Sequence, residues 1–163
     1  MIKVLIGFFC VLVITTPCFA EMREQQQKLF KINIPEGWSY EEKADSFSIR
    51  DPEKQDGISI VFSPLVAQTE DEALLKLEQG LSVMAVMMYR VSPDIKETQI
   101  DNVKALQLDY IWPEDPDKSQ FPYNSHVSCY YNGLGYQINY GSKDFKEKAL
   151  MEETVRSFRF EKK

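Results

Sequence analysis

Histidine, cysteine and basic charge are scarce in this chain of 163 residues. His126 is its one histidine, and two of its three cysteines, Cys10 and Cys18, lie near the N-terminus. If that N-terminal segment is removed, as predicted below, Cys129 is the one thiol left, and a lone thiol forms no internal disulfide. One histidine and one such cysteine are also too few for a transition-metal site. We therefore expect no metal, no cofactor and a fold that rests on its apolar core.

The charge balance excludes another class of partner. The chain carries 25 acidic and 19 basic residues, a formal net charge of −6, and its lysines and arginines form no cluster. Such a surface is repelled by the phosphate backbone of nucleic acids and by anionic lipids. Nucleic acid is therefore not an expected partner.

The chain also lacks an apolar stretch long enough to anchor it in a membrane. The apolar run at residues 4–14 falls short of the roughly 20 residues that cross the hydrocarbon core. Lys3 precedes this run, and small side chains at Cys18 and Ala20 follow it. That order is typical of a secretory signal peptide. We predict that residues 1–20 are removed, which leaves a periplasmic or secreted protein without a transmembrane anchor.

Lipid attachment at Cys18 is the alternative to simple cleavage. Residues 15–17, Thr-Thr-Pro, fit this alternative poorly. A lipoprotein signal normally has leucine three positions before the cysteine and glycine or alanine directly before it. Processing at Cys18 would give a tethered protein instead of a released one.

The remainder reads as a short lead-in followed by one domain. Residues 21–28 are polar and aperiodic and are predicted to be flexible. Residues 29–163 suffice for a single domain with its own core. Short segments with the composition and alternation of β-strands occur at residues 29–34, 47–50, 57–63, 95–100, 103–112, 124–131 and 134–140.

Two helices are predicted between and after these strands. Thr69 and Glu72 have the spacing of a capping box, and the apolar periodicity that follows ends near Tyr89. A second helix is expected over residues 143–156, with Ser142 as its cap. Its inner stripe is predicted to consist of Phe145, Ala149, Leu150 and Val155.

The clearest local signal is the Asn-Gly dipeptide at 132–133. This dipeptide favours a two-residue hairpin turn and thereby fixes the pairing of the flanking strands. In that register Val127 points to an apolar face, whereas His126, Gln137 and Asn139 point to the other face. A half-buried antiparallel sheet has this division, so we expect the polar face to be exposed.

Several short segments resemble the PsbP-like superfamily. They are residues 34–38 (Ile-Pro-Glu-Gly-Trp), 57–64, the helix after them and 157–160 (Ser-Phe-Arg-Phe). The chain is most similar in style to small exported bacterial members of the DcrB type, over residues 29–160. The resemblance implies an α+β fold in which helices flank an antiparallel β-sheet, an α/β/α sandwich. It also implies binding or assembly rather than catalysis, and it transfers no functional residue.

A candidate ligand site lies on the predicted polar face. If the strand at 103–112 pairs with the hairpin, Asp109 joins His126, Gln137 and Asn139 there. An Asp–His couple is also part of a hydrolase triad, but the sequence has no nucleophile elbow. Cys129 points to the opposite face from His126 and reads as a small core residue. A small-molecule or metal carrier is therefore the second hypothesis, and a hydrolase is the third, with no catalytic residue assigned.

The long connection at residues 113–123 is the candidate partner contact. Trp112, Phe121 and Tyr123 bracket an acidic stretch, and connections of this length in compact domains are often functional. Its acidic residues, 114, 115 and 117, supply too few oxygens for a calcium site. The apolar residues at 83–89 are a second candidate contact. The leading hypothesis is a non-enzymatic accessory protein that binds another extracytoplasmic or envelope protein.

Overall fold

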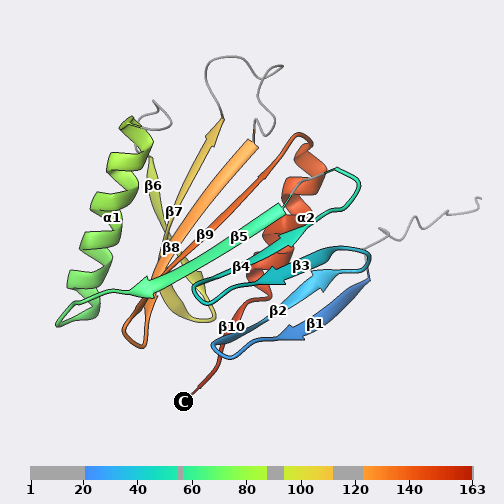
Figure 1. Cartoon of the computed structure of the whole chain (residues 1–163). Helices are drawn as coiled ribbons and strands as arrows, with labels where there is room; N and C mark the ends of the chain where they lie inside the picture. Colours follow the sequence, from blue (N-terminus) through green and yellow to red (C-terminus); the bar gives the residue numbers. More distant parts are fainter. Residues whose placement is uncertain (1–20, 55–56, 88–93, 112–122, 163) are drawn as a thin grey trace, which may run out of the picture.

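The computed structural model describes residues 21–54, 57–87, 94–111 and 123–162, without the side chain of Ile111 (Figure 1). Within these ranges the chain forms strands and two helices. The elements are β1 (Met22–Gln26), β2 (Phe30–Pro35), β3 (Ser39–Glu42), β4 (Ser46–Arg50), β5 (Gly57–Pro64), α1 (Glu70–Met87), β6 (Ile95–Ile100), β7 (Val103–Ile111), β8 (Tyr123–Tyr131), β9 (Leu134–Ser142), α2 (Phe145–Arg156) and β10 (Arg159–Phe160). Neither helix is both long and apolar enough to cross a membrane.

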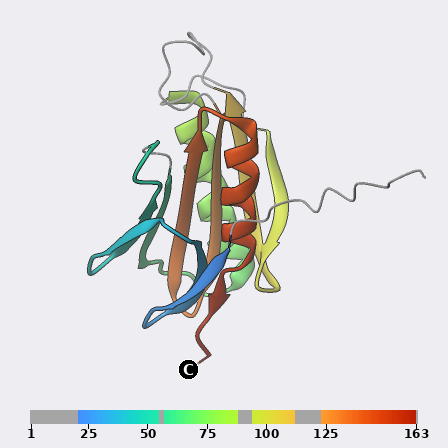
Figure 2. The ribbon, with the colours of Figure 1, turned by 90° about the vertical axis from the view of Figure 1, so that its right-hand side faces the viewer.

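The strands form two antiparallel sheets. The larger has seven strands in the order β3-β4-β5-β9-β8-β7-β6, and the smaller has three in the order β1-β2-β10. The smaller sheet and α2 lie next to each other on one side of the larger sheet (Figures 1 and 2). The predicted α+β fold with an antiparallel sheet and flanking helices is confirmed, and the small sheet shares the layer of α2.

The predicted turn at 132–133 and the β6–β7 turn at 101–102 both have left-handed backbone conformations at their two central residues. Asn132 and Gly133 have φ of 49° and 82°, and Asp101 and Asn102 have φ of 49° and 65°. Positive φ at both positions is the type I′ arrangement, whose twist matches that of the flanking strands. The β8–β9 register is confirmed, with His126 opposite Asn139.

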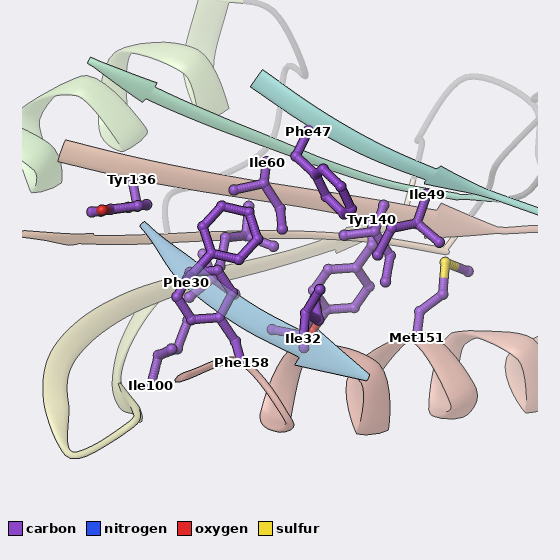
Figure 3. Close-up of a cluster of buried hydrophobic side chains, with 14 of the residues drawn as sticks. Phe30, Ile32, Phe47, Ile49, Ile60, Ile100, Tyr136, Tyr140, Met151 and Phe158 are labelled. Atoms are coloured by element: carbon purple, nitrogen blue, oxygen red, sulfur yellow. The ribbon is translucent and has the colours of Figure 1, made fainter. Parts of the chain in front are cut away.

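The main core lies between the larger sheet and the layer formed by α2 and β2. Phe30 and Ile32 of β2 meet Phe47 and Ile49 of β4, and Met151 of α2 lies beside them (Figure 3). The rings of Phe30 and Phe158 stack with centroids 4.6 Å apart. Burial of this apolar surface supplies the main driving force for folding, because no disulfide is present among the described residues.

The opposite face of the larger sheet is covered over only part of its width. Helix α1 contacts β6, β7 and β8, where Leu77 and Leu81 pack against Leu106 (Figure 1). The part formed by β4, β5 and the C-terminal half of β9 lies beyond this cover, whereas Leu77 of α1 still approaches Gly135 at the start of β9. The prediction of a uniformly exposed polar face is therefore wrong, because His126 and Ser128 are buried on this face.

Helix α1 begins as the sequence predicts. The hydroxyl of Thr69 accepts a hydrogen bond from the Glu72 backbone N–H at 3.2 Å. The return bond differs from the usual capping box, since Glu72 Oε2 accepts from the backbone N–H of Gln68 at 2.8 Å. The predicted end near Tyr89 lies outside the described residues.

Helix α2 begins two residues later than predicted, and its buried face differs. Asp144, not Ser142, is the N-cap, and its carboxylate accepts from the Lys146 backbone N–H at 2.8 Å. The buried residues of the helix are Met151, Thr154 and Val155, whereas Phe145 is 70% exposed and Ala149 is exposed. The predicted stripe is therefore half right: Val155 is buried and Leu150 packs against the core, whereas Phe145 and Ala149 do not. The helix also turns Thr154 toward the core, where its hydroxyl donates to the Leu150 carbonyl at 3.0 Å.

The predicted flexible lead-in contains a strand. Residues 22–26 form β1, which pairs with β2 along its whole length. The Glu21 carbonyl also accepts a hydrogen bond from the Glu36 backbone N–H at 2.7 Å. No local periodicity indicates this strand, because it lies at the edge of a small sheet and its partner supplies the stabilisation.

Candidate functional site

The uncovered part of the α1 face holds a cleft of about 690 Å³. It lies at one end of β4, β5 and β9, and the first residues of β8 and the last of β7 complete it. The side chains and backbone that line it include Ser39, Ser48, Arg50, Asp51, Gly57, Ser59, Tyr110, Asn124, Asn139 and Gly141.

Strand register explains why the sheet is hollow at this point. One cross-strand row runs through Arg50, Gly57, Gly141, Asn124 and Tyr110. The two glycines in its middle leave the backbone of β5 and β9 as the floor, and the larger side chains stand on either side. A Cβ added at Gly57 would lie 2.5 Å from the Ile49 carbonyl oxygen, so a side chain is not tolerated there without movement.

The cleft offers hydroxyl and amide groups, which can both donate and accept hydrogen bonds, and one positive charge. Arg50 is exposed, and among the described residues its guanidinium has no ion pair. Ser48 and Ser59 pair across β4 and β5 on the same face, beside Asn139. The nearby Asp51 carboxylate already accepts the Glu53 backbone N–H at 2.8 Å. This arrangement suits a ligand group that accepts hydrogen bonds, such as a carboxylate or a peptide carbonyl.

The four predicted ligand residues are separated by the fold. Asn139 lines the cleft, and Gln137 is exposed on the same face of β9, opposite Val61 of β5. His126 shares that face but lies on β8, within the part that α1 covers. Asp109 lies on the other face of the sheet.

His126 is not available to a ligand or a substrate in this state. Its side chain is 2% exposed, and neither ring nitrogen has a hydrogen-bond partner. Burial lowers the pKa of His126 to about 4, so the ring is neutral at pH 7. The prediction of an exposed histidine is wrong because the helix covers β8, which hairpin register alone does not reveal.

The predicted Asp109–His126 couple is not formed. In the β7–β8 register Leu108 stands opposite His126, whereas Asp109 stands opposite Ser125. Neighbouring positions on a strand point to opposite faces, so the sheet separates the carboxylate from the imidazole. A hydrolase mechanism based on this pair is therefore contradicted by the geometry.

Asp109 instead belongs to a polar cluster that joins the sheet to α2. Its Oδ1 accepts hydrogen bonds from Ser125 Oγ and, at 3.0 Å, from Gln107 Nε2, and Lys148 Nζ lies 3.4 Å away. Burial raises the pKa of Asp109, but the hydrogen bonds from Ser125 and Gln107 and the charge of Lys148 outweigh burial and hold the pKa below its ordinary value. Sequence reasoning missed Ser125 and Lys148, which the β7–β8 register and the helix together bring to this point.

Cys129 is a core residue, as predicted. It is fully buried on the face opposite His126, and burial raises the pKa of its thiol to about 12. The reactive thiolate is therefore essentially absent near neutral pH. Among the described residues no three histidine, cysteine or acidic side chains gather as metal ligands.

The predicted partner residues are only partly within the described chain. Trp112 and Phe121 lie outside it, as do the acidic residues 114, 115 and 117 and most of the connection. Tyr123 begins β8, is half-buried and meets the Phe145 ring edge-on with centroids 6.0 Å apart. Tyr110 and Asn124, close to the two ends of this connection, both line the cleft.

The cleft itself was not predicted. The available signal was the presence of Gly57 and Gly141 at strand ends, since a glycine within a strand often marks a close backbone approach or a bound ligand. That these glycines face one another depends on the pairing of β5 with β9, which no short-range turn specifies.

Comparison with known proteins supports the fold. No protein-family model and no curated protein matches the sequence. The solution structure of cyanobacterial PsbP (CyanoP) from Synechocystis sp. PCC 6803 aligns with a TM-score of 0.64 at 12% identity, over 87% of this chain and 94% of that chain. A crystal structure from Bacteroides thetaiotaomicron VPI-5482 aligns with a TM-score of 0.53 at 13% identity, over 82% of this chain and 46% of that chain. The chain therefore has a PsbP-like fold.

Proposed function

We propose that this chain is an exported, non-enzymatic accessory protein that binds another extracytoplasmic protein through its polar cleft. The PsbP-like fold is consistent with an accessory role. Removal of residues 1–20, with lipid attachment at Cys18 as the alternative, and a relationship to small exported DcrB-type proteins belong to the same proposal.

The observation that carries the proposal is the cleft with Arg50, which has no ion pair within the described part of the chain. An open floor of backbone between Gly57 and Gly141 can receive an extended segment of a partner, and Arg50 can pair with a carboxylate of that segment. Trp112, Phe121 and Tyr123 are proposed to add apolar contact beside the cleft, because Tyr110 and Asn124 at its edge flank their connection. The Tyr123 ring lies against Phe145 of α2, so its contribution would be made from the other face of the sheet. The histidine that a hydrolase would need is enclosed under α1.

Site-specific photocrosslinking in an envelope extract tests this proposal. A photoreactive residue in place of Ser59, inside the cleft, should give one discrete crosslinked partner that mass spectrometry identifies. Arg50→Gln should remove that product, whereas Arg156→Gln, which changes an exposed arginine at the end of α2, should leave it intact. Phe121→Ala with Tyr123→Ala should weaken it. A crosslink that Arg50→Gln does not diminish would place the binding site elsewhere.

A small polar ligand is the second candidate occupant. The cleft volume of about 690 Å³ is within the range of small-molecule sites, and its lining is rich in hydroxyl and amide groups. Thermal shifts against a panel of carboxylates and sugars, with Asn139→Ala as the control variant, test this candidate. A shift that persists unchanged in Asn139→Ala would argue against binding in the cleft.

A further inference from the structure

Helix α1 is held to the larger sheet by a small apolar cluster that is separate from the main core. The buried members of this cluster are Leu74, Leu77, Leu81 and Leu106. The main core lies on the opposite face of the sheet. The outer side of the helix exposes Val83, Val86 and Met87, so the helix is held from one side, and Gly80 in its middle lowers helix stability by about 1 kcal/mol relative to alanine. Elements attached in this way can open locally while the rest of a domain stays folded.

His126 lies beneath the second half of α1. Met84 of the helix and Ile95 of β6 both pack against the leucine cluster. Ile95 stands opposite Leu108 of β7, and Leu108 stands opposite His126 of β8. One cross-strand row therefore places the imidazole in the interface between the helix and the sheet, where it is 2% exposed.

Within the described residues, nothing in this interface compensates a positive charge on the ring. Both ring nitrogens are buried without a hydrogen-bond partner. Residues 79–87 of the helix carry no charged side chain, because its charged residues are 70–72, 76 and 78. The other charged or titratable side chains that β4 to β9 place on this face are Arg50, Glu97, Lys104, Tyr110 and Tyr130. None of these stands opposite His126, and Glu97 is paired with Lys104 at 3.0 Å.

We propose that α1 is a cover released by acid: a proton on His126 frees the helix from β8 while the main core stays folded. Under the helix a charged ring has neither water nor a partner, whereas in the released state water solvates it. The pKa of the ring is lowered to about 4 by burial and returns to about 6.5 on release. Between these two values only the released state binds the proton, so its population should rise about 25-fold from pH 7.5 to pH 5.0.

Release of the helix lengthens the polar cleft. Ser48, Ser59 and Asn139 line the cleft and stand in the same cross-strand row as His126. With α1 displaced, this row continues across β8, and the ring nitrogens become available as hydrogen-bonding groups. The inference concerns the attachment of α1 and does not require that the cleft binds a partner, so it and the proposed function fail separately.

Two neighbouring thiols on opposite faces of β8 test the inference. Ser128 is 1% exposed on the α1 face, and Cys129 is buried in the main core on the other face. In Ser128→Cys, the rate at which a dithiodipyridine reagent labels each thiol, divided by its rate in urea at the same pH, gives the open fraction on each face. The open fraction at position 128 should rise about 25-fold from pH 7.5 to pH 5.0 and exceed that at Cys129 at least about tenfold. Equal open fractions at the two positions would show that the whole domain opens and would overturn the inference.

Hydrogen exchange of the unsubstituted chain gives a second measurement. After correction for intrinsic exchange rates, the protection of the Leu77 and Leu81 amides should fall about 25-fold over the same pH range, with a weaker urea dependence than that of Met151 in α2. His126→Leu should keep this protection constant, whereas Ser128→Ala should keep the wild-type response. A fall that persists in His126→Leu, or a urea dependence equal to that of Met151, would contradict the acid-released cover.

Discussion

Replacing His126 with leucine should remove a pH-dependent weakness of the fold. The imidazole is buried on the α1 face of β8 with both nitrogens unpaired, opposite the buried Leu108. Leucine has a similar volume and leaves no buried polar atom without a partner. At pH 7.5 the substitution should raise the free energy of unfolding by about 1 to 3 kcal/mol, the usual penalty for such an unsatisfied group.

The pH dependence follows from two pKa values. In an unfolded chain the pKa of histidine is about 6.5, and burial lowers the pKa of His126 to about 4. Above about pH 6.5 both states hold a neutral ring, so this residue adds no pH dependence. Between the two pKa values only the unfolded state binds the proton, so stability falls as the pH falls and levels off below about pH 4. The full loss is about 3 kcal/mol, of which about 2 kcal/mol is reached at pH 5.

Urea unfolding, followed by the fluorescence of the buried Trp38, measures this difference at pH 7.5, 6.5, 5.5 and 5.0. Because the chain has a single histidine, the difference between wild type and His126→Leu isolates one ring. Ser128→Ala, at another buried polar position of the same face, is the control and should keep the wild-type profile. Parallel profiles for wild type and His126→Leu, or an ordinary histidine pKa measured by NMR in the folded protein, would refute the reasoning.

Further substitutions test the glycine floor, the polar cluster and the thiol. Gly57→Ala should lower the free energy of unfolding by about 1 to 3 kcal/mol, because the new Cβ would meet the Ile49 carbonyl oxygen. Gly80→Ala should raise it by about 1 kcal/mol, because the new Cβ in α1 would have open space around it. Urea unfolding measures both, and the opposite order of the two variants would contradict this. Asp109→Asn should lower the free energy of unfolding by about 1 to 3 kcal/mol at pH 7. Because the folded protein holds the pKa of this carboxyl low, the difference from wild type should shrink as the pH falls below about 4. A difference that stays constant down to pH 2 would count against the polar cluster. Cys129 should react with a disulfide reagent at pH 8 only in urea, and rapid labelling of the folded protein would show that the core opens there.

Short-range signals in the sequence predicted much of the fold. The Asn-Gly turn fixed the β8–β9 register, and the Thr69 and Glu72 spacing located the start of α1. These features depend on contacts between residues close in sequence, so their physics is visible locally. The resemblance to the PsbP-like superfamily supplied the overall arrangement, and the PsbP-like fold is confirmed.

The functional surface was harder to predict because it depends on long-range placement. Which face Asp109 occupies depends on the register of β7 against β8, whose connection is long and sets no fixed pairing. Whether His126 is exposed depends on where α1 packs, and the hollow at Gly57 and Gly141 depends on the pairing of β5 with β9. None of these can be read from the neighbouring residues alone.

The smaller sheet joins the two ends of the domain. β10, at residues 159–160, pairs with β2 near residue 30, and Phe158 stacks on Phe30. If the chain is threaded through a translocation channel with its N-terminus first, β2 emerges early. It cannot pair with β10 until almost the whole chain has passed. Contacts of such long sequence separation form late, and the unpaired edge is prone to wrong association in the meantime. A short deletion at the C-terminus would mimic incomplete passage and would show how strongly maturation depends on this final pairing. A chaperone that shields β2 during passage should reduce that dependence.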